Sequence, residues 1–218
     1  MTHQARAATF AAAFVATAAF AAALATGATQ LAVPSPNLLA NAGAEDGPAA
    51  DGPIPVPIPS WATTGGMTVS KYVADIFHPK TFPGSGVNYF AGSVGPGAKP
   101  VSTATQVVDV SAYAGLIGNA KLKLRLTGML GGYSGQDDRA SLRAVFLGKG
   151  TKSLGRIDVA GPLDADRSGK SVLLPRAGSA VVPAGTRRIR VSIIAIWIRG
   201  GTNDGWVDNV SATLVKNR

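Results

Sequence analysis

The stretch KLKLRLT, residues 121–127, alternates charged and apolar side chains without interruption. Leu122, Leu124 and Leu126 share one side of an extended chain, and the lysines, the arginine and the threonine share the other. Strict alternation is typical of a β-strand with one face in a core and one in water. This stretch therefore predicts an antiparallel sheet with one solvated face.

Weaker versions of the same pattern occur at 103–110, 141–147, 155–159 and 207–215. The segment 186–199, TRRIRVSIIAIWIR, begins half-exposed and becomes apolar on both sides, which predicts a central strand covered on both faces at its far end. Clusters of Gly, Pro, Asn and Asp separate these stretches, and no helical periodicity occurs after residue 28. The pattern predicts an all-β fold, a two-sheet antiparallel jelly-roll sandwich.

The first 28 residues differ from the rest of the chain. Arg6 precedes an apolar run over 7–25, and the small residues Thr26, Gly27 and Ala28 follow it. This order predicts a secretory signal peptide cleaved after Ala28 and a secreted protein, although the run is nearly long enough for an uncleaved membrane anchor. No later stretch is long enough to cross a bilayer. We expect a signal peptide at 1–28, a linker at 29–36 and a β-sandwich binding domain at 37–218.

Composition restricts the chemistry of the chain. It has 218 residues, no cysteine and a net charge of +9. Without thiols, the domain must be stabilised by its core or by a metal, and a thiol nucleophile or cysteine-bound zinc is excluded. A basic surface favours anionic partners, but the charges are spread along the chain with no run longer than Arg187-Arg188. We therefore expect a solvated surface, no specific nucleic-acid binding and a monomer.

Catalytic patterns are scarce. After the predicted signal peptide the only histidine is His78, which precedes a proline, and no Gly-x-Ser-x-Gly motif accompanies it. Asp137 and Asp138 are adjacent, so on a strand they would point to opposite faces and make a poor acid/base pair. The chain also lacks a phosphate-binding glycine loop. We expect a protein that is not an enzyme; a hydrolase using Asp137, Asp138 and Asp204 is the alternative.

Two acids suggest a metal. Asp208 lies in phase with Val210, Ala212 and Leu214, which predicts that its carboxylate points toward the core. A buried carboxylate is costly unless it is paired or bound to a metal. Glu45 is the only glutamate, and Asp46 and Gly47 follow it. Calcium takes such oxygen ligands; the alternative is that Asp208 starts a strand and accepts hydrogen bonds from a turn.

Four motifs in order resemble carbohydrate-binding modules with the galactose-binding-domain-like jelly roll. They are NLLANAGAEDG at 37–47 followed by Trp61, QVVDV at 106–110, VPAGTR at 182–187 and GWVDNVS at 205–211. The motifs LGGYSGQDDRA at 130–140 and NDGWVDNVS at 203–211 are similar to a group of secreted bacterial domains. The resemblance implies two antiparallel sheets, neighbouring chain ends and a structural calcium held by Glu45 and Asp208. Ala44 departs from the family, which usually has an aromatic residue there.

The resemblance also directs attention to two loops. Sugar sites stack rings on aromatic side chains and bind hydroxyls with amides and carboxylates. If the loops meet at one end of the sandwich, a ligand site would comprise Tyr133, Gln136, Asp137, Trp197, Asn203 and Asp204. Alternatively, the loops only turn the chain or hold a second calcium, and Trp61, Trp197 and Trp206 are core aromatics.

These observations predict a secreted, non-catalytic module for carbohydrate or cell-envelope glycan. The alternative is a structural or adhesive surface protein that binds protein or polyanion.

Overall fold

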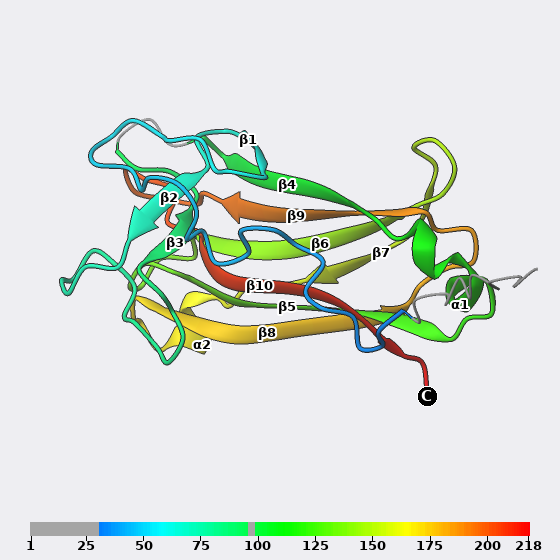
Figure 1. The fold of residues 1–218 in the computed structure, drawn as a ribbon. Coiled ribbons are helices and arrows are strands. Elements are labelled where there is room, and N and C mark those ends of the chain that lie inside the picture. Colours follow the sequence, from blue (N-terminus) through cyan, green and yellow to red (C-terminus); the bar gives the residue numbers. More distant parts are fainter. Residues whose placement is uncertain (1–30, 96–98) are drawn as a thin grey trace, which may run out of the picture. The chain divides into compact units, whose positions relative to one another are not determined.

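The computed structural model describes residues 31–95 and 99–218, and within them ten strands form two five-stranded antiparallel sheets (Figure 1). Sheet 1 has the order β1 (Ala62–Thr64), β4 (Val101–Asp109), β9 (Arg188–Ile196), β6 (Arg139–Leu147) and β7 (Ser153–Val159). Sheet 2 has the order β2 (Thr68–Lys71), β3 (Asn88–Ala91), β10 (Trp206–Lys216), β5 (Leu122–Gly132) and β8 (Val172–Val181). The predicted all-β, two-sheet antiparallel sandwich is confirmed.

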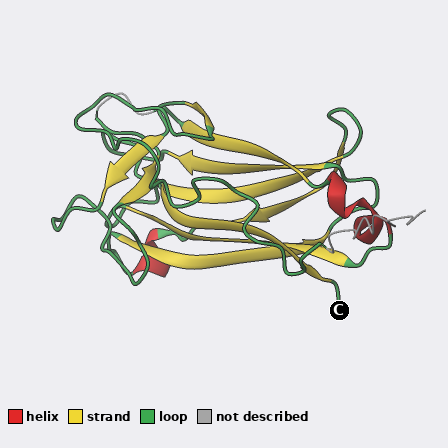
Figure 2. Cartoon of the chain, viewed as in Figure 1, coloured by secondary structure: helices red, strands yellow, loops and turns green. Residues whose placement is uncertain are grey.

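Helical structure in the described residues is limited to short turns (Figure 2). They are η1 (Ser111–Tyr113), α1 (Ala114–Gly118) and α2 (Asp164–Arg167). Each is about one turn long, too short to produce a helical repeat in the sequence. The described residues include no helix that is long and apolar enough to cross a membrane.

The core lies between the sheets and follows the predicted alternation. Leu122, Leu124 and Leu126 of β5 are buried against the opposite sheet, while Arg125 is exposed. Strand β9 occupies the centre of sheet 1 as predicted. Its outer face is less covered than expected, because Ile194 at the far end is only partly buried.

Strands β1, β2, β3 and β8 were not predicted. The first three have only three or four residues, too few to establish a repeat. Strand β8 contains Pro175 and Gly178, which interrupt a strand pattern. Its position at the edge of sheet 2 explains why a proline is tolerated there, since one side of an edge strand needs no ladder hydrogen bonds.

A β-bulge in β10 changes where Asp208 points. Asp208 is opposite Met129 and Ser211 is opposite Thr127, so β10 has one residue more than β5 in this interval. The extra residue is accommodated at Asn209, whose φ of 48° is in the left-handed region. The bulge reverses the alternation, so Val207 joins Val210 in the core. The prediction that Asp208 is buried is confirmed, but its predicted direction toward the core is wrong.

The start of the described domain runs along β10. The amide of Ser35 donates to the Leu214 carbonyl, and the amide of Leu38 donates to the Ala212 carbonyl, both at 2.9 Å. Ser35, within the stretch predicted as a linker, is thus held by the last strand. The predicted signal peptide lies outside the described residues.

Candidate functional site: a cavity at the loop end of the sandwich

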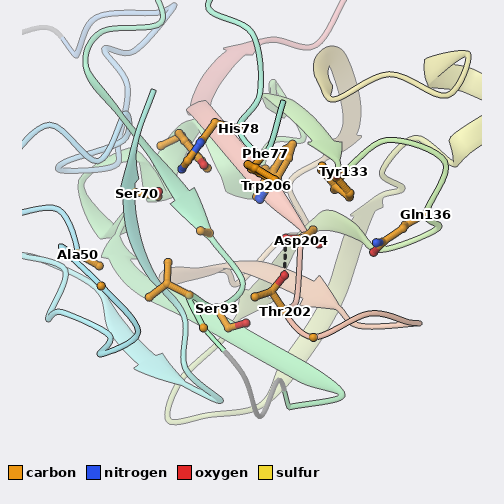
Figure 3. Close-up of a pocket in the computed structure, with 16 residues that line it drawn as sticks. Ala50, Ser70, Phe77, His78, Ser93, Tyr133, Gln136, Thr202, Asp204 and Trp206 are labelled. Carbon is orange, nitrogen blue, oxygen red and sulfur yellow. Dashed lines mark hydrogen bonds between the residues drawn. The ribbon is translucent and has the colours of Figure 1, made fainter. Parts of the chain in front are cut away.

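A cavity of about 430 Å³ opens at the end of sheet 2 where β3 ends and β10 begins (Figure 3). Its walls come from β3, from the start of β10 and from loops far apart in the sequence. Ser93 follows β3, Tyr133 and Gln136 follow β5, and Thr202 and Asp204 precede β10. The two loops singled out in the sequence therefore meet at this cavity.

Aromatic rings form one side of the cavity. Trp206 is buried, and its ring lies edge-on to Tyr89 at 5.9 Å and to Tyr133 at 6.3 Å between centroids. Phe77 stacks on Tyr133 at 6.4 Å with only 14° between the ring planes. Edge-to-face and offset pairs at these distances are mutually stabilising. The cluster therefore offers rigid apolar surfaces to a ligand.

Polar groups face the same space. Thr202 Oγ1 donates to Asp204 Oδ1 at 2.9 Å (Figure 3). Burial, reinforced by the negative charge of Asp138, raises the pKa of the Asp204 carboxyl to about 6, although the Thr202 hydrogen bond opposes the shift. Gln136 Oε1 is buried and has no hydrogen-bond partner among the described residues. Asp204 can thus supply a carboxylate oxygen to a ligand, whereas Gln136 Oε1 is enclosed by protein.

Two fully buried side chains hold the loops around the cavity. The Asp138 carboxylate accepts hydrogen bonds from the amides of Ile198 at 2.6 Å, Arg199 at 3.0 Å and Asp204 at 3.1 Å. The Asn203 side chain donates to the Ala195 carbonyl at 3.3 Å and accepts from the Gly205 amide at 3.2 Å. Both side chains have their hydrogen-bonding capacity engaged by backbone, so they position the site rather than contact a ligand.

A buried arginine holds the loop that carries Tyr133 and Gln136. Arg167 of α2 is 2% exposed and donates to the carbonyls of Gly132 at 2.7 Å, Ser134 at 2.9 Å and Lys170 at 2.7 Å. It also donates to the Gln136 carbonyl. Burial lowers the pKa of this guanidinium, and nearby aspartates oppose that effect. One side chain therefore holds four backbone carbonyls in place.

The six predicted ligand residues have different positions. Tyr133, Gln136 and Asp204 line the cavity, and the buried Asn203 hydrogen-bonds the backbone next to it. Asp137 is turned toward α2, where its Oδ1 accepts from the Asp164 amide at 3.0 Å. Trp197 does not line the cavity; its indole donates to the Gly200 carbonyl at 3.2 Å.

Other lining residues were missed from the sequence: Phe77, His78, Tyr89, Ser93, Thr202 and Trp206. Phe77 and His78 lie in the loop between β2 and β3 (the 72–87 loop), which has no strand periodicity. His78 also lines the cavity, and its Nδ1 lies 2.7 Å from Asp75 Oδ1. Trp206 belongs both to a small hydrophobic cluster on the outer face of sheet 2 and to the cavity wall. The sequence feature that could have indicated these lining residues is the concentration of aromatic side chains around Gly- and Pro-rich turns.

The predicted metal ligands lie in one region beside β10. Asp208 Oδ2 accepts from the Tyr72 hydroxyl at 2.8 Å, and Oδ1 accepts from the Asn209 amide at 2.6 Å. Glu45 Oε1 accepts from the amides of Val87 and Asn88, each at 3.1 Å. Burial raises the pKa of Asp208 to about 7, with a further contribution from the negative charge of Glu45. The two carboxylates are therefore close enough to repel each other.

The surroundings fit a hard cation. Asn88 Oδ1 is buried and has no partner among the described residues, while its Nδ2 donates to the Ala44 carbonyl at 3.1 Å. The described residues contain no cluster of three acidic, histidine or cysteine side chains. Calcium, which accepts amide, carbonyl and water oxygens beside carboxylates, suits this donor set better than zinc does. Gly86 permits the approach of Glu45, since a Cβ there would lie 2.1 Å from Oε1.

The raised pKa values predict a pH dependence. In calcium-free buffer, folded Asp208 keeps its proton up to about pH 7, whereas an unfolded aspartate loses it at about pH 4. Between these values the folded state binds more protons, so the free energy of unfolding falls as pH rises, by on the order of 4 kcal/mol. Urea unfolding at several pH values should show this slope. The raised pKa of Asp204 contributes in the same direction, so the Asp208→Asn variant should retain only part of this pH dependence. An unchanged slope in that variant would contradict the raised pKa of Asp208.

Comparison with known proteins supports the fold alone. No family model matches the chain, and no curated protein sequence matches it. Among solved structures, the chain is similar to the enzymatically active domain of tailspike protein 4 from bacteriophage CBA120, with 16% identity and a TM-score of 0.53. That match covers 82% of this chain and 21% of the tailspike chain, so this protein spans about a fifth of its relative.

Cyclases from Fischerella sp. TAU match over nearly their whole length. One, solved with (3Z)-3-(1-methyl-2-pyrrolidinylidene)-3H-indole, has 13% identity and a TM-score of 0.55, covering 85% of this chain and 99% of the cyclase. Another, solved with 4-(1H-indol-3-yl)butan-2-one, has 15% identity and a TM-score of 0.55, covering 86% and 100%. At these identities, the similarity establishes a shared β-sandwich and does not extend to activity.

Proposed function

We propose that this protein is a secreted, non-catalytic module that binds carbohydrate or cell-envelope glycan in the loop-end cavity. The supporting observation is a cavity that combines aromatic surfaces with a polar group, the Asp204 carboxylate. Ligand sites commonly combine apolar walls with a few placed polar groups. Secretion rests on the predicted signal peptide. The proposal includes a structural calcium at Glu45 and Asp208.

The engagement of the neighbouring acids favours binding over hydrolysis. A glycosidase of the usual kind needs two carboxyl groups placed on either side of the scissile bond. Asp138 is occupied by three backbone amides, and Asp137 is turned toward α2. Asp204 is thus the one carboxylate among the residues that line the cavity.

A second candidate function is the binding of a fused aromatic ligand in the same loop-end cavity. The rings around Trp206 and the raised pKa of Asp204 favour it, since such a carboxyl can exchange a proton with a bound ligand near neutral pH. The Fischerella cyclases with the same fold were solved with indole compounds. Calorimetric titration with indole compounds and with glycans separates the two candidate functions, because each predicts binding of its own class of ligand.

Calorimetric titration of cavity variants tests the leading proposal. With a glycan that the wild type binds, Tyr133→Ala and Asp204→Ala should each weaken binding at least about tenfold, because each removes a stacking surface or a charged hydrogen-bonding group. Tyr113→Ala is the matched control, since Tyr113 is a partly buried tyrosine in η1 and does not line the cavity. Unchanged affinity in both cavity variants places the site elsewhere.

A further inference from the structure

The outer face of sheet 2 carries a groove separate from the loop-end cavity. It consists of two hollows, of about 430 Å³ and about 370 Å³, which share Arg125 and Ala177 and so are continuous. One hollow ends at Phe82 and Met129, and the other reaches Lys123. Neither hollow shares a lining residue with the loop-end cavity. The groove is therefore a distinct feature of the fold.

Strand pairing explains the groove. Strand β5 lies between β10 and β8, and its outward residues include Lys123, Arg125 and Thr127. The positions paired with Arg125 and Thr127 on the flanking strands all carry short side chains: Ser211, Thr213, Ala177 and Ser179. The long cationic side chains of β5 consequently project beside short neighbours on β10 and β8, which leaves room for a ligand around them.

The groove is positively charged. Lys123 and Arg125 form no ion pair with any described residue, and Arg176 pairs with Asp166 at 3.2 Å at the edge of the groove. No acidic residue lines either hollow. On the outer face of sheet 1, by contrast, Arg143 and Arg156 both pair with Asp158, at 2.5 and 2.7 Å. Arg188 and Arg190 on that face form no ion pair with a described residue either, so what distinguishes Lys123 and Arg125 is that they line a hollow.

We propose that this groove binds a linear anionic glycan, one that carries carboxylates or phosphodiesters along its length. Lys123 and Arg125 are two residues apart on one strand, about 7 Å, so they form a row instead of converging on one small anion. A guanidinium binds carboxylate and phosphate groups through paired hydrogen bonds. The wall formed by Phe82, Pro83 and Met129 offers apolar surface to the sugar rings.

The groove lacks the features of a single-stranded nucleic-acid site. Such sites stack successive bases on a series of aromatic side chains. Phe82 is the one aromatic residue that lines the groove, and its ring is engaged edge-on with Tyr72 at 6.4 Å. The observations therefore favour a charged glycan over an oligonucleotide.

Binding assays with defined polymers test the proposal. The probes are polygalacturonate for carboxylates, poly(glycerol phosphate) for phosphodiesters, dextran as a neutral glycan and a single-stranded oligonucleotide. We expect the wild type to bind at least one anionic polymer better than dextran and the oligonucleotide, with affinity falling as salt rises. Whichever anionic polymer binds more tightly identifies the charged group. Failure to bind both anionic polymers, or a preference for the oligonucleotide, overturns the proposal.

Paired substitutions locate the contact. The double variant Lys123→Gln/Arg125→Gln should bind at least about tenfold more weakly, since two charge-assisted contacts are lost. The double variant Arg188→Gln/Arg190→Gln removes the same charge from the outer face of sheet 1 and should change affinity less than about threefold. Equal losses in both would mean that net charge alone attracts the polymer, which contradicts a groove site. Asp204→Ala should leave polymer binding intact, so the groove and the loop-end cavity are tested separately.

Discussion

Replacing Arg167 with methionine is expected to lower the free energy of unfolding by about 3–5 kcal/mol, a loss typical of breaking a buried polar network. The substitution preserves an unbranched apolar stem but leaves the carbonyls of Gly132, Ser134, Gln136 and Lys170 without their donor. Each buried carbonyl left unpaired costs about 1–3 kcal/mol. Because three of these carbonyls, those of Gly132, Ser134 and Gln136, belong to the segment that carries Tyr133 and Gln136, ligand binding should be lost as well. Urea unfolding and calorimetric titration measure the two effects.

Arg176→Met provides the matched control. Arg176 belongs to β8 and pairs with a single, partly exposed carboxylate of Asp166 at 3.2 Å. Exposed pairs of this kind contribute less than about 1 kcal/mol. Arg167→Lys should not restore stability, since one ammonium has three donors and cannot span four carbonyls. If Arg167→Met proves as mild as Arg176→Met, Arg167 does not hold the loop as described.

Removing calcium is expected to lower the melting temperature of the purified domain by roughly 5–10 °C. A ligand present at 100 times its Kd stabilises the folded state by about 2.7 kcal/mol, and 1 kcal/mol shifts a domain of this size by about 2–4 °C. The ion would favour the ionised form of Asp208, whose pKa burial otherwise raises to about 7. Thermal unfolding with excess calcium and with a chelator measures the difference.

The response should disappear in Asp208→Ala and persist in Asp158→Ala. Asp158 lies on the outer face of sheet 1, where it pairs with two arginines instead of another acid. A melting temperature that is the same with calcium and with chelator in the wild type would assign Glu45 and Asp208 to hydrogen bonding alone. In that case burial would keep Asp208 partly protonated near neutral pH, against the opposing effect of the Tyr72 hydrogen bond.

Side-chain alternation predicted the strands that carry the core, because leucines at 122, 124 and 126 can share a face only in an extended chain. It could not predict β8, where Pro175 and Gly178 are tolerated only because that strand forms the edge of sheet 2. Nor could it predict the direction of Asp208, since the bulge at Asn209 depends on a left-handed backbone conformation that leaves no trace in hydropathy.

Some residues of the cavity could be predicted from their positions in the sequence. Asp137 and Asp138 were expected to point in different directions, and although they lie in the loop before β6 and not in a strand, Asp138 is buried while Asp137 is exposed. Tyr133, Gln136 and Asp204 were grouped on the condition that their loops meet at one end of the sandwich, and the loops do meet there. Phe77 was missed, since its stacking on Tyr133 depends on how the 72–87 loop packs against sheet 2.

A glycan array probed with the wild type and with Tyr133→Ala in parallel tests the central claim, that the loop-end cavity binds carbohydrate. The account predicts a defined set of neutral glycans bound by the wild type, with their intensity lost in Tyr133→Ala. Binding of neutral glycans that persists unchanged in Tyr133→Ala, or a wild-type protein that binds no neutral glycan on the array, would contradict it.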